Sequence, residues 1–217
     1  MKQFKDRQDV GKKLSQKLLS LKGQKPLILS LVRGGILVGY EIAVALEGEL
    51  EPFFAKKIGH PDSPEFAIAA LTATGILVKN ENWVSSVDPI WFEKTVLQTQ
   101  KNLEKRVQTF IGHPPRKSLE GQVVILCDDG IATGLTMEAA LIECRNMHPK
   151  KLILAVGVAP ESTLEKLKSF CDDIVTLYTV PHQSLFQAVG QFYEYFPQVE
   201  EVEAVEIYQK FLHRGKK

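Results

Sequence analysis

The sequence predicts an α/β fold in which a parallel sheet is covered by helices on both faces, giving three layers. Apolar runs of strand length alternate along the chain with longer segments of helical periodicity. The clearest example is the apolar run at 123–127, which is followed by two acids, a loop of small residues and a helical pattern at 137–145. In sheets of this kind ligands bind at the carboxyl ends of the strands, so the loops that follow strands are the first places to look for a site.

The first half of the chain supplies the opening elements of this alternation. Residues 8–21 carry apolar side chains at helical spacing, and 26–32 read as a buried strand. A helix is predicted over 36–46, and a second strand over 53–57. The segment 58–74 has little periodicity and is predicted to be a long loop.

The second half continues the pattern. A short strand is predicted at 75–78, and Asp88 followed by Pro89 is a typical start for a helix, here running to about Ile111. The elements expected after 145 are a strand at 151–158, a helix at 161–170, a strand at 173–178, an aromatic segment at 185–196 and a last helix near 200–212.

Composition limits the class of protein. With 217 residues, of which 44% are hydrophobic, the chain is predicted to form a single domain over 1–217 with a full core, and two small domains are the alternative. A net charge of +1 gives no electrostatic reason to expect nucleic acid or a membrane surface as a partner. The charged start predicts no signal peptide, and three widely spaced cysteines are expected to be buried thiols of a cytoplasmic protein.

Several nucleotide and hydrolase motifs are absent from the sequence. There is no Gly-x4-Gly-Lys-Ser/Thr loop and no Gly-x-Gly-x-x-Gly fingerprint, which argues against Walker-type and dinucleotide-binding proteins. There is no Gly-x-Ser-x-Gly elbow, and the acids are adjacent and late in the chain, which makes a hydrolase or phosphatase the weakest alternative. The five histidines show no metal-ligand spacing.

The segment 128–136 has the properties of an anion site. Glycines allow the main chain to approach a ligand, and the start of a helix offers free N–H groups and a favourable dipole. Asp128 and Asp129 would repel a phosphate there unless they bind another part of the same ligand, such as sugar hydroxyls. A phosphorylated sugar would satisfy both halves of the segment.

This segment resembles the phosphoribosyl diphosphate (PRPP) loop of the type I phosphoribosyltransferases. The resemblance implies that Asp128 and Asp129 bind the ribose hydroxyls, and that they hold Mg²⁺ directly or through water. It implies that the 5′-phosphate is bound by Gly130, Ile131, Ala132, Thr133, Gly134, Leu135 and Thr136.

Two further segments match the same family. Arg33, Gly34 and Gly35 follow the first predicted sheet strand and resemble the pyrophosphate loop, which often contains a cis peptide; arginine and a helix start both suit phosphate oxygens. Lys56 and Lys57 end the next strand, where many members carry a basic residue. Because strand side chains alternate, only one of the two is expected to reach the site, and we favour Lys57.

The resemblance also implies a lid and a hood. The segment 59–70, with His60 and Glu65, occupies the position of the family's flexible loop, which would exclude water during reaction. A small hood over the acceptor is expected from residues near 180–200 together with the N-terminal residues. Phe192 or Tyr193 could stack on a base there, although core packing is the more common role of such rings.

The whole set, which begins with Phe4-x-Asp6-Arg7, resembles bacterial predicted phosphoribosyltransferases. The implied function is Mg²⁺-assisted phosphoribosyl transfer from PRPP to a nucleobase-like nitrogen in nucleotide salvage, with release of pyrophosphate and Asp128, Asp129, Arg33 and Lys57 in catalytic roles. The alternative is a regulator of the same fold that binds PRPP or a nucleotide without catalysis. The loop at 131–133 lacks the acid that purine enzymes commonly carry, so the acceptor stays open, as does the oligomeric state, for which a homodimer is the family's common form.

Overall fold

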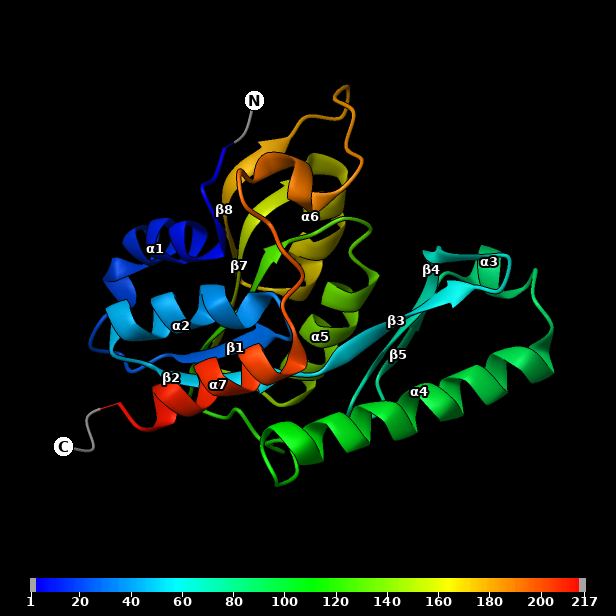
Figure 1. Cartoon of the computed structure of the whole chain (residues 1–217), viewed down its shortest axis with the longest axis horizontal. Helices are drawn as coiled ribbons and strands as arrows, with labels where there is room; N and C mark the ends of the chain where they lie inside the picture. Colours follow the sequence, from blue (N-terminus) through cyan, green and yellow to red (C-terminus); the bar gives the residue numbers. More distant parts are fainter. Residues whose placement is uncertain (1–2, 215–217) are drawn as a thin grey trace.

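The computed structural model describes residues 3–214 (Figure 1). Its centre is a parallel sheet of five strands in the order β2-β1-β6-β7-β8. The strands are β1 (Leu27–Leu31), β2 (Glu49–Phe53), β6 (Val123–Gly130), β7 (Lys151–Pro160) and β8 (Asp173–Val180). The prediction of a parallel α/β sheet is confirmed.

Helices cover both faces of this sheet and make the three layers expected from the sequence. On one face lie α1 (Arg7–Lys17) and α2 (Gly35–Leu46), and on the other lie α5 (Leu135–Asn146) and α6 (Glu161–Leu167) (Figure 1). Alternate residues of β6 belong to two different apolar clusters, one with α1 and α2 and the other with α5. The strands are therefore apolar on both sides, as parallel sheets with covered faces require.

The tail of the chain returns to the first of these faces. After β8 it passes through a short 3-10 helix, η3 (Val189–Phe192), and ends in α7 (Glu201–Leu212), which packs against α2 and β2. Phe4 pairs with Tyr193 in an isolated bridge, so the start of the chain and its tail segment lie side by side. The predicted helices at 8–21 and 161–170 each finish in a 3-10 turn, η1 (Leu19–Leu21) and η2 (Lys168–Phe170).

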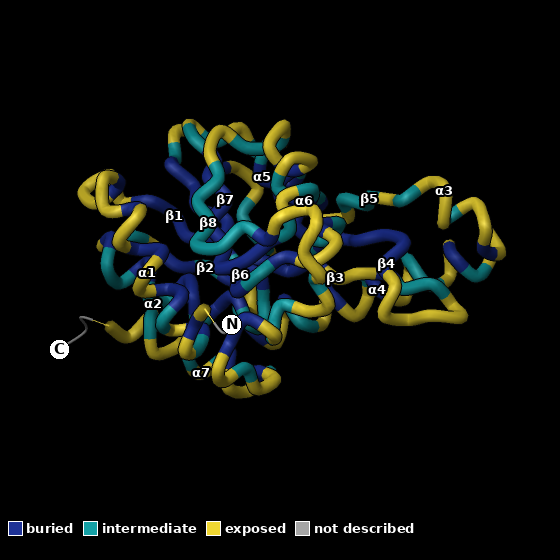
Figure 2. The backbone as a smooth tube through the Cα atoms, turned by 90° about the horizontal axis from the view of Figure 1, so that it is seen from above, coloured by how far each residue is buried: buried dark blue, intermediate teal, exposed yellow. Residues whose placement is uncertain are grey.

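A second, three-stranded sheet forms an arm beside the core (Figure 1). It consists of β3 (Ala55–His60), β4 (Ser63–Thr72) and β5 (Leu77–Lys79), followed by α3 (Glu81–Val84) and the long α4 (Pro89–Phe110). Figure 2 shows buried residues along the central sheet and exposed ones on the outer part of the arm. Among residues 3–214, no helix is long and apolar enough to span a membrane.

The arm corrects two expectations from the sequence. The single strand predicted at 53–57 is wrong, because β2 ends at Phe53 and the chain leaves the parallel sheet there to begin β3. The segment 58–74 is not an irregular loop, because β4 pairs antiparallel with β3, with Lys57 opposite Ala70. Every residue of β4 from 67 to 72 is buried, so buried and exposed residues do not alternate there. The sequence of this strand therefore lacks the period of two that marks a half-buried strand.

Candidate functional site

The two acids lie at the carboxyl end of β6, in the middle of the sheet. The side chain of Asp129 is buried, with the residue only 8% exposed, whereas Asp128 is partly open to solvent. The main-chain N–H of Asp129 donates to Oδ1 of Asp128 at 2.8 Å. Asp128 lines both of the cavities described below, and Asp129 lines one of them.

Burial controls the acidity of this pair. It raises the pKa of Asp128 well above its ordinary value, and the negative charge of Asp129 raises that pKa further. Burial also raises the pKa of Asp129, but the Arg7 guanidinium opposes that rise. The pair is therefore an unfavourable concentration of charge that a bound cation or hydroxyl donors would relieve.

A cavity of about 250 Å³ lies over the loop that joins β6 to α5. Its walls include Thr133, Gly134 and Thr136, as the sequence predicted for the phosphate loop. Gly134 has φ +86°, a conformation that glycine adopts without strain. The first N–H groups of α5 have no partner inside the helix and are free for an anion.

Two contacts define which groups of this loop are available. The N–H of Ile131 donates to the carbonyl of Val158 at 2.8 Å, and its side chain is buried, so this residue's N–H is already used. The hydroxyl of Thr163 on α6 donates to the carbonyl of Ala132 at 2.9 Å and anchors the loop. The main-chain donors of the loop that face the cavity are therefore sought among residues 132–136 and not at Ile131.

The loop at 33–35, which we name the pyrophosphate loop after the resemblance, adjoins the acids from the neighbouring strand. The peptide between Val32 and Arg33 is cis, as the resemblance implied. A Cβ atom on Gly34 would lie 2.3 Å from Oδ2 of Asp129, and one on Gly35 would lie 3.0 Å from Oδ1 of Asp128. Glycine at both positions is therefore what lets this loop reach the acid pair.

The arm contributes Lys57 to the cavity over the β6–α5 loop. Lys57 and Glu65 both line it, and Lys56 does not. The choice of Lys57 over Lys56 as the residue that faces the site agrees with this arrangement. His60 lies at the turn of the hairpin, where its Nδ1 accepts a hydrogen bond from the N–H of Asp62 at 3.2 Å, and it lines neither cavity.

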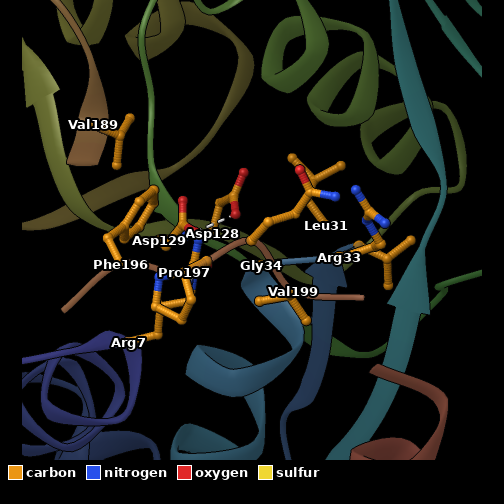
Figure 3. A pocket seen from close by; sticks show the side chains of 12 residues that line it. Arg7, Leu31, Arg33, Gly34, Asp128, Asp129, Val189, Phe196, Pro197 and Val199 are labelled. Carbon is orange, nitrogen blue, oxygen red and sulfur yellow. Dashed lines mark hydrogen bonds and ion pairs between the residues drawn. The ribbon is translucent and has the colours of Figure 1, made fainter. Parts of the chain in front are cut away.

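A larger cavity of about 530 Å³ opens between the pyrophosphate loop and the tail of the chain (Figure 3). We call residues 185–199 the hood segment; Val189, Phe196 and Val199 from it line this cavity. A Cβ atom on Gly130 would lie 2.6 Å from Cγ1 of Val189, so a glycine in β6 lets the hood segment sit directly on the strand. Arg33 lines the same cavity, with Nη1 3.6 Å from Oε2 of Glu200.

The aromatic residues of the hood segment do not present open faces to this cavity. Phe192 and Tyr193 are 7% and 1% exposed and belong to the core, so stacking of a base on either ring is not supported. Phe196 is the one ring among the described residues that line the cavity. The Arg7 guanidinium carbon lies 3.7 Å from its centroid, and the centroid of the Tyr193 ring lies 4.6 Å from it.

Sequence reasoning gave no role to Arg7, which the structure places inside the site. Its Nε lies 2.6 Å from Oδ2 of Asp129, and its Nη1 donates to the carbonyl of Pro197 at 2.7 Å (Figure 3). The only signal for it in the sequence was its place in the Phe4-x-Asp6-Arg7 motif. The predicted helix began at residue 8, just after this arginine, and periodicity could not show which residue the arginine meets.

Comparison with known proteins shows the family to which this fold belongs. The model of the phosphoribosyl transferase domain family matches residues 1–185. Two proteins of Mycobacterium tuberculosis (strains CDC 1551 / Oshkosh and ATCC 25618 / H37Rv) named as phosphoribosyl transferases are 34% identical over 207 residues, which is 94% of this chain and 46% of theirs. The chain thus spans about half the length of these curated relatives.

A solved structure matches nearly the whole chain. The crystal structure of the protein TT1426 from Thermus thermophilus superposes with a TM-score of 0.77 at 34% identity, covering 96% of this chain and 99% of that one. The family model covers residues 1–185, and the relatives and this structure extend over 94% and 96% of the chain. The chain therefore belongs to the phosphoribosyl transferase family.

Proposed function

We propose that this chain transfers the phosphoribosyl group of PRPP to a nitrogen of a small nucleobase-like acceptor and releases pyrophosphate. The observation that carries the proposal is that the two cavities share Leu31 and Asp128 in their walls. The two cavities thus form one continuous surface. PRPP has a phosphate at one end, a sugar in the middle and a diphosphate at the other, so it has a matching group for each part of that surface.

The parts of PRPP would divide among the described residues as follows. The N–H groups of 132–136 and the hydroxyls of Thr133 and Thr136 would bind the 5′-phosphate. Asp128 would bind ribose hydroxyls beside it. Arg33 from one cavity and Lys57 from the other would face the pyrophosphate, where arginine can form two parallel hydrogen bonds to phosphate oxygens.

The donor set also fits a magnesium ion. Mg²⁺ in nucleotide enzymes is bound through one or two carboxylates together with substrate phosphates and water, and Asp128 is a carboxylate of raised pKa that faces both cavities. Bound there with PRPP, the ion would neutralise negative charge on the diphosphate. Asp129 is less available for this role, because Oδ2 already accepts from Arg7.

The reaction requires little covalent chemistry from the protein. The bond between ribose C1 and the pyrophosphate oxygen breaks, and the oxygen keeps the electron pair. The acceptor nitrogen forms the new bond to C1 and loses its proton to solvent or to a neighbouring base. Arg33 and Lys57 would stabilise the charge that grows on the leaving group, and the hood segment and the arm would limit the access of water to C1.

The acceptor is the least determined part of the proposal. Residues 131–133 carry no acid, which removes the usual purine contact from that loop. The larger cavity offers apolar walls and the Arg33 guanidinium, and its one aromatic ring among the described residues already contacts the Arg7 guanidinium and the Tyr193 ring. A cytoplasmic salvage role and a homodimer stay predictions.

The first test is a thermal melt of the protein with and without PRPP and Mg²⁺, with Asp128→Asn alongside. Ligand at 100 times Kd adds about 2.7 kcal/mol to the free energy of unfolding. For a protein of this size, each kcal/mol raises the Tm by about 2–4 °C. We expect a Mg²⁺-dependent rise that Asp128→Asn loses, because the variant keeps the shape of the side chain without its charge. No rise at millimolar PRPP would contradict the proposal.

A second measurement separates the enzyme from the regulator. Pyrophosphate release from PRPP is followed with a panel of nucleobases and other small heterocyclic nitrogen acceptors, with the protein lacking acceptor as the baseline. Release that depends on one acceptor supports the transferase. PRPP binding without release for any acceptor would instead support a PRPP-binding regulator of the same fold.

A further inference from the structure

We propose that Arg7 is the positioning residue of this site, joining Asp129 to the hood segment so that Asp128 is the carboxylate left for the ligand. The statement about the ligand rests on the proposed function. The statement about the hood segment does not, because it concerns contacts that exist without a ligand.

Arg7 brings together parts of the chain that are far apart in sequence. Its Nε donates to Oδ2 of Asp129 at 2.6 Å, across 122 positions, and its Nη1 donates to the carbonyl of Pro197 at 2.7 Å, across 190 positions. Its guanidinium carbon lies 3.7 Å from the centroid of the Phe196 ring. One side chain thus makes an ion pair with the acids and a hydrogen bond and a cation–π contact with the hood segment.

The pyrophosphate loop rests on the same ion pair. A Cβ atom on Gly34 would approach Oδ2 of Asp129 to 2.3 Å and Nε of Arg7 to 3.1 Å. The Tyr193 hydroxyl adds a second link, because it donates to the main-chain carbonyl of Asp129 at 2.6 Å. The pyrophosphate loop and the hood segment therefore both lie directly against the Arg7–Asp129 pair.

The pair is buried, so its two members depend on each other. Arg7 is 7% exposed and Asp129 is 8% exposed. Removal of one partner from a buried pair leaves the other charge without compensation, whereas removal of both is often far less costly. Without Arg7, the Asp129 carboxylate would also lie beside Asp128 with no counter-charge next to it.

The arrangement gives the two adjacent acids different tasks. Asp128 lines both cavities and accepts one hydrogen bond from the main chain. Asp129 has its Oδ2 committed to Arg7 and lines only the larger cavity. Arg7 and Asp129 should therefore behave as one unit in mutagenesis, whereas Arg7 acts on Asp128 through its charge.

The test compares Arg7→Met, Arg7→Lys, Asp129→Asn and the double variant Arg7→Met/Asp129→Asn in the full chain. Two quantities are measured: the amide hydrogen exchange of residues 189–199 without ligand, and the Kd of PRPP with Mg²⁺ by calorimetry. Arg106→Met is the matched control, because Arg106 also pairs with a carboxylate, that of Glu201 at 3.1 Å, but lines neither cavity.

We expect Arg7→Met to speed exchange in the hood segment and to raise the Kd of PRPP, each by about tenfold or more. Arg7→Lys should recover most of the affinity, because it keeps a cation beside Asp129, and less of the exchange protection, because it lacks the planar group that spans Pro197 and Phe196. The double variant should be no worse than Arg7→Met. Arg106→Met should change neither quantity.

Three outcomes would overturn the proposal: unchanged exchange and Kd in Arg7→Met, strictly additive effects of Arg7→Met and Asp129→Asn, or no recovery by Arg7→Lys. The double variant lacks both charges of the pair and so leaves neither buried without a partner. It can therefore be measured even if Arg7→Met alone does not fold. If the wild-type chain does not bind PRPP, the proposed function fails, and the exchange of the hood segment still decides the role of Arg7.

Discussion

The Nζ atom of Lys57 lies 2.7 Å from Oε2 of Glu65, and it also donates to the main-chain carbonyl of Glu65 at 3.2 Å. Both residues belong to the hairpin of the arm, and both side chains are exposed to solvent. Lys57 lowers the pKa of the Glu65 carboxyl by hydrogen bonding and by its charge. Because exposed ion pairs are weak, a phosphate group could take the place of Glu65 on Lys57.

This pair leads to a prediction about affinity for PRPP. Glu65→Gln should lower the Kd of PRPP several-fold at low salt, because a competing carboxylate is removed, and the gain should shrink as salt screens the site. Lys57→Ala should raise the Kd by about tenfold, the loss expected for one charge-assisted hydrogen bond. Lys56→Ala is the matched control and should match the wild type; an equal loss in both lysine variants would contradict the assignment of Lys57.

A second prediction concerns stability. The pKa of Asp128 is raised by burial and by Asp129, so the folded protein binds this proton more tightly than the unfolded chain does. The free energy of unfolding then falls as the pH rises from the ordinary aspartate pKa to the raised pKa of Asp128. The full cost of ionising Asp128 in the folded protein is present once the pH exceeds that raised pKa. Asp128→Asn should therefore melt above the wild type at pH 7, by about 2–4 °C for each kcal/mol of penalty removed.

The same variant provides its own control in pH. In metal-free buffer the difference in Tm between Asp128→Asn and wild type should shrink toward zero near pH 4, where the penalty for ionising the folded aspartate is largely absent. Melting curves over pH 4–8 test this. A wild type that is the more stable of the two at pH 7 would show that Asp128 has a stabilising partner.

Gly34 gives a prediction about packing. Gly34→Ala places a methyl group 2.3 Å from Oδ2 of Asp129, so either the pyrophosphate loop or the ion pair must move. We expect a loss of about 1–3 kcal/mol in the free energy of unfolding, together with weaker PRPP binding. Gly75→Ala is the comparison, because a Cβ there meets no atom within 4 Å although φ is +98°; denaturation and calorimetry should show lost stability with unchanged Kd.

The cysteines give a chemical prediction. Cys127 is completely buried, its Sγ lies 3.2 Å from the Ser30 hydroxyl, and burial raises its pKa to about 12. Cys144 is also buried, whereas Cys171 is partly exposed. Alkylation of the native protein at pH 8, read by peptide mass spectrometry, should label Cys171 first and leave Cys127 unmodified. Rapid labelling of Cys127 would argue that this thiol has a role beyond packing.

The elements of the central sheet could be predicted because each combines a local signal with a local end. The apolar run of β6 stops at two acids. Outside the sheet, Asp88 caps the start of α4, because its Oδ1 accepts from the N–H of Ile90. The split at Phe53 could not be predicted in this way. The carbonyl of Phe53 accepts from Val32 and that of Phe54 accepts from Ala73, so neighbouring peptides join different sheets through distant partners.

The site residues divide in the same way into those with a local sequence signal and those that depend on distant partners. Asp128, Gly34 and the phosphate loop sit at strand ends or helix starts, where local sequence identifies them and where the fold then gathers them. Lys57 lies inside β3, and it reaches the cavity because of the hairpin that the sequence did not reveal. The place of the Phe196 ring and the role of Arg7 depend on contacts across most of the chain. No spacing rule reports such contacts, because loop closure over long separations leaves no periodic trace in the sequence.

The bond from Arg7 to the Pro197 carbonyl also has a consequence for synthesis on the ribosome. The first helix emerges early, but its arginine has neither of its partners until translation has passed residues 129 and 197. Until then the acids at the end of β6 lack the full set of contacts around their counter-charge, and the nascent chain cannot form a competent ligand site. A tag fused close to residue 3 would disturb the same late event, since the N–H of Gln3 donates to the carbonyl of Phe192 at 2.8 Å.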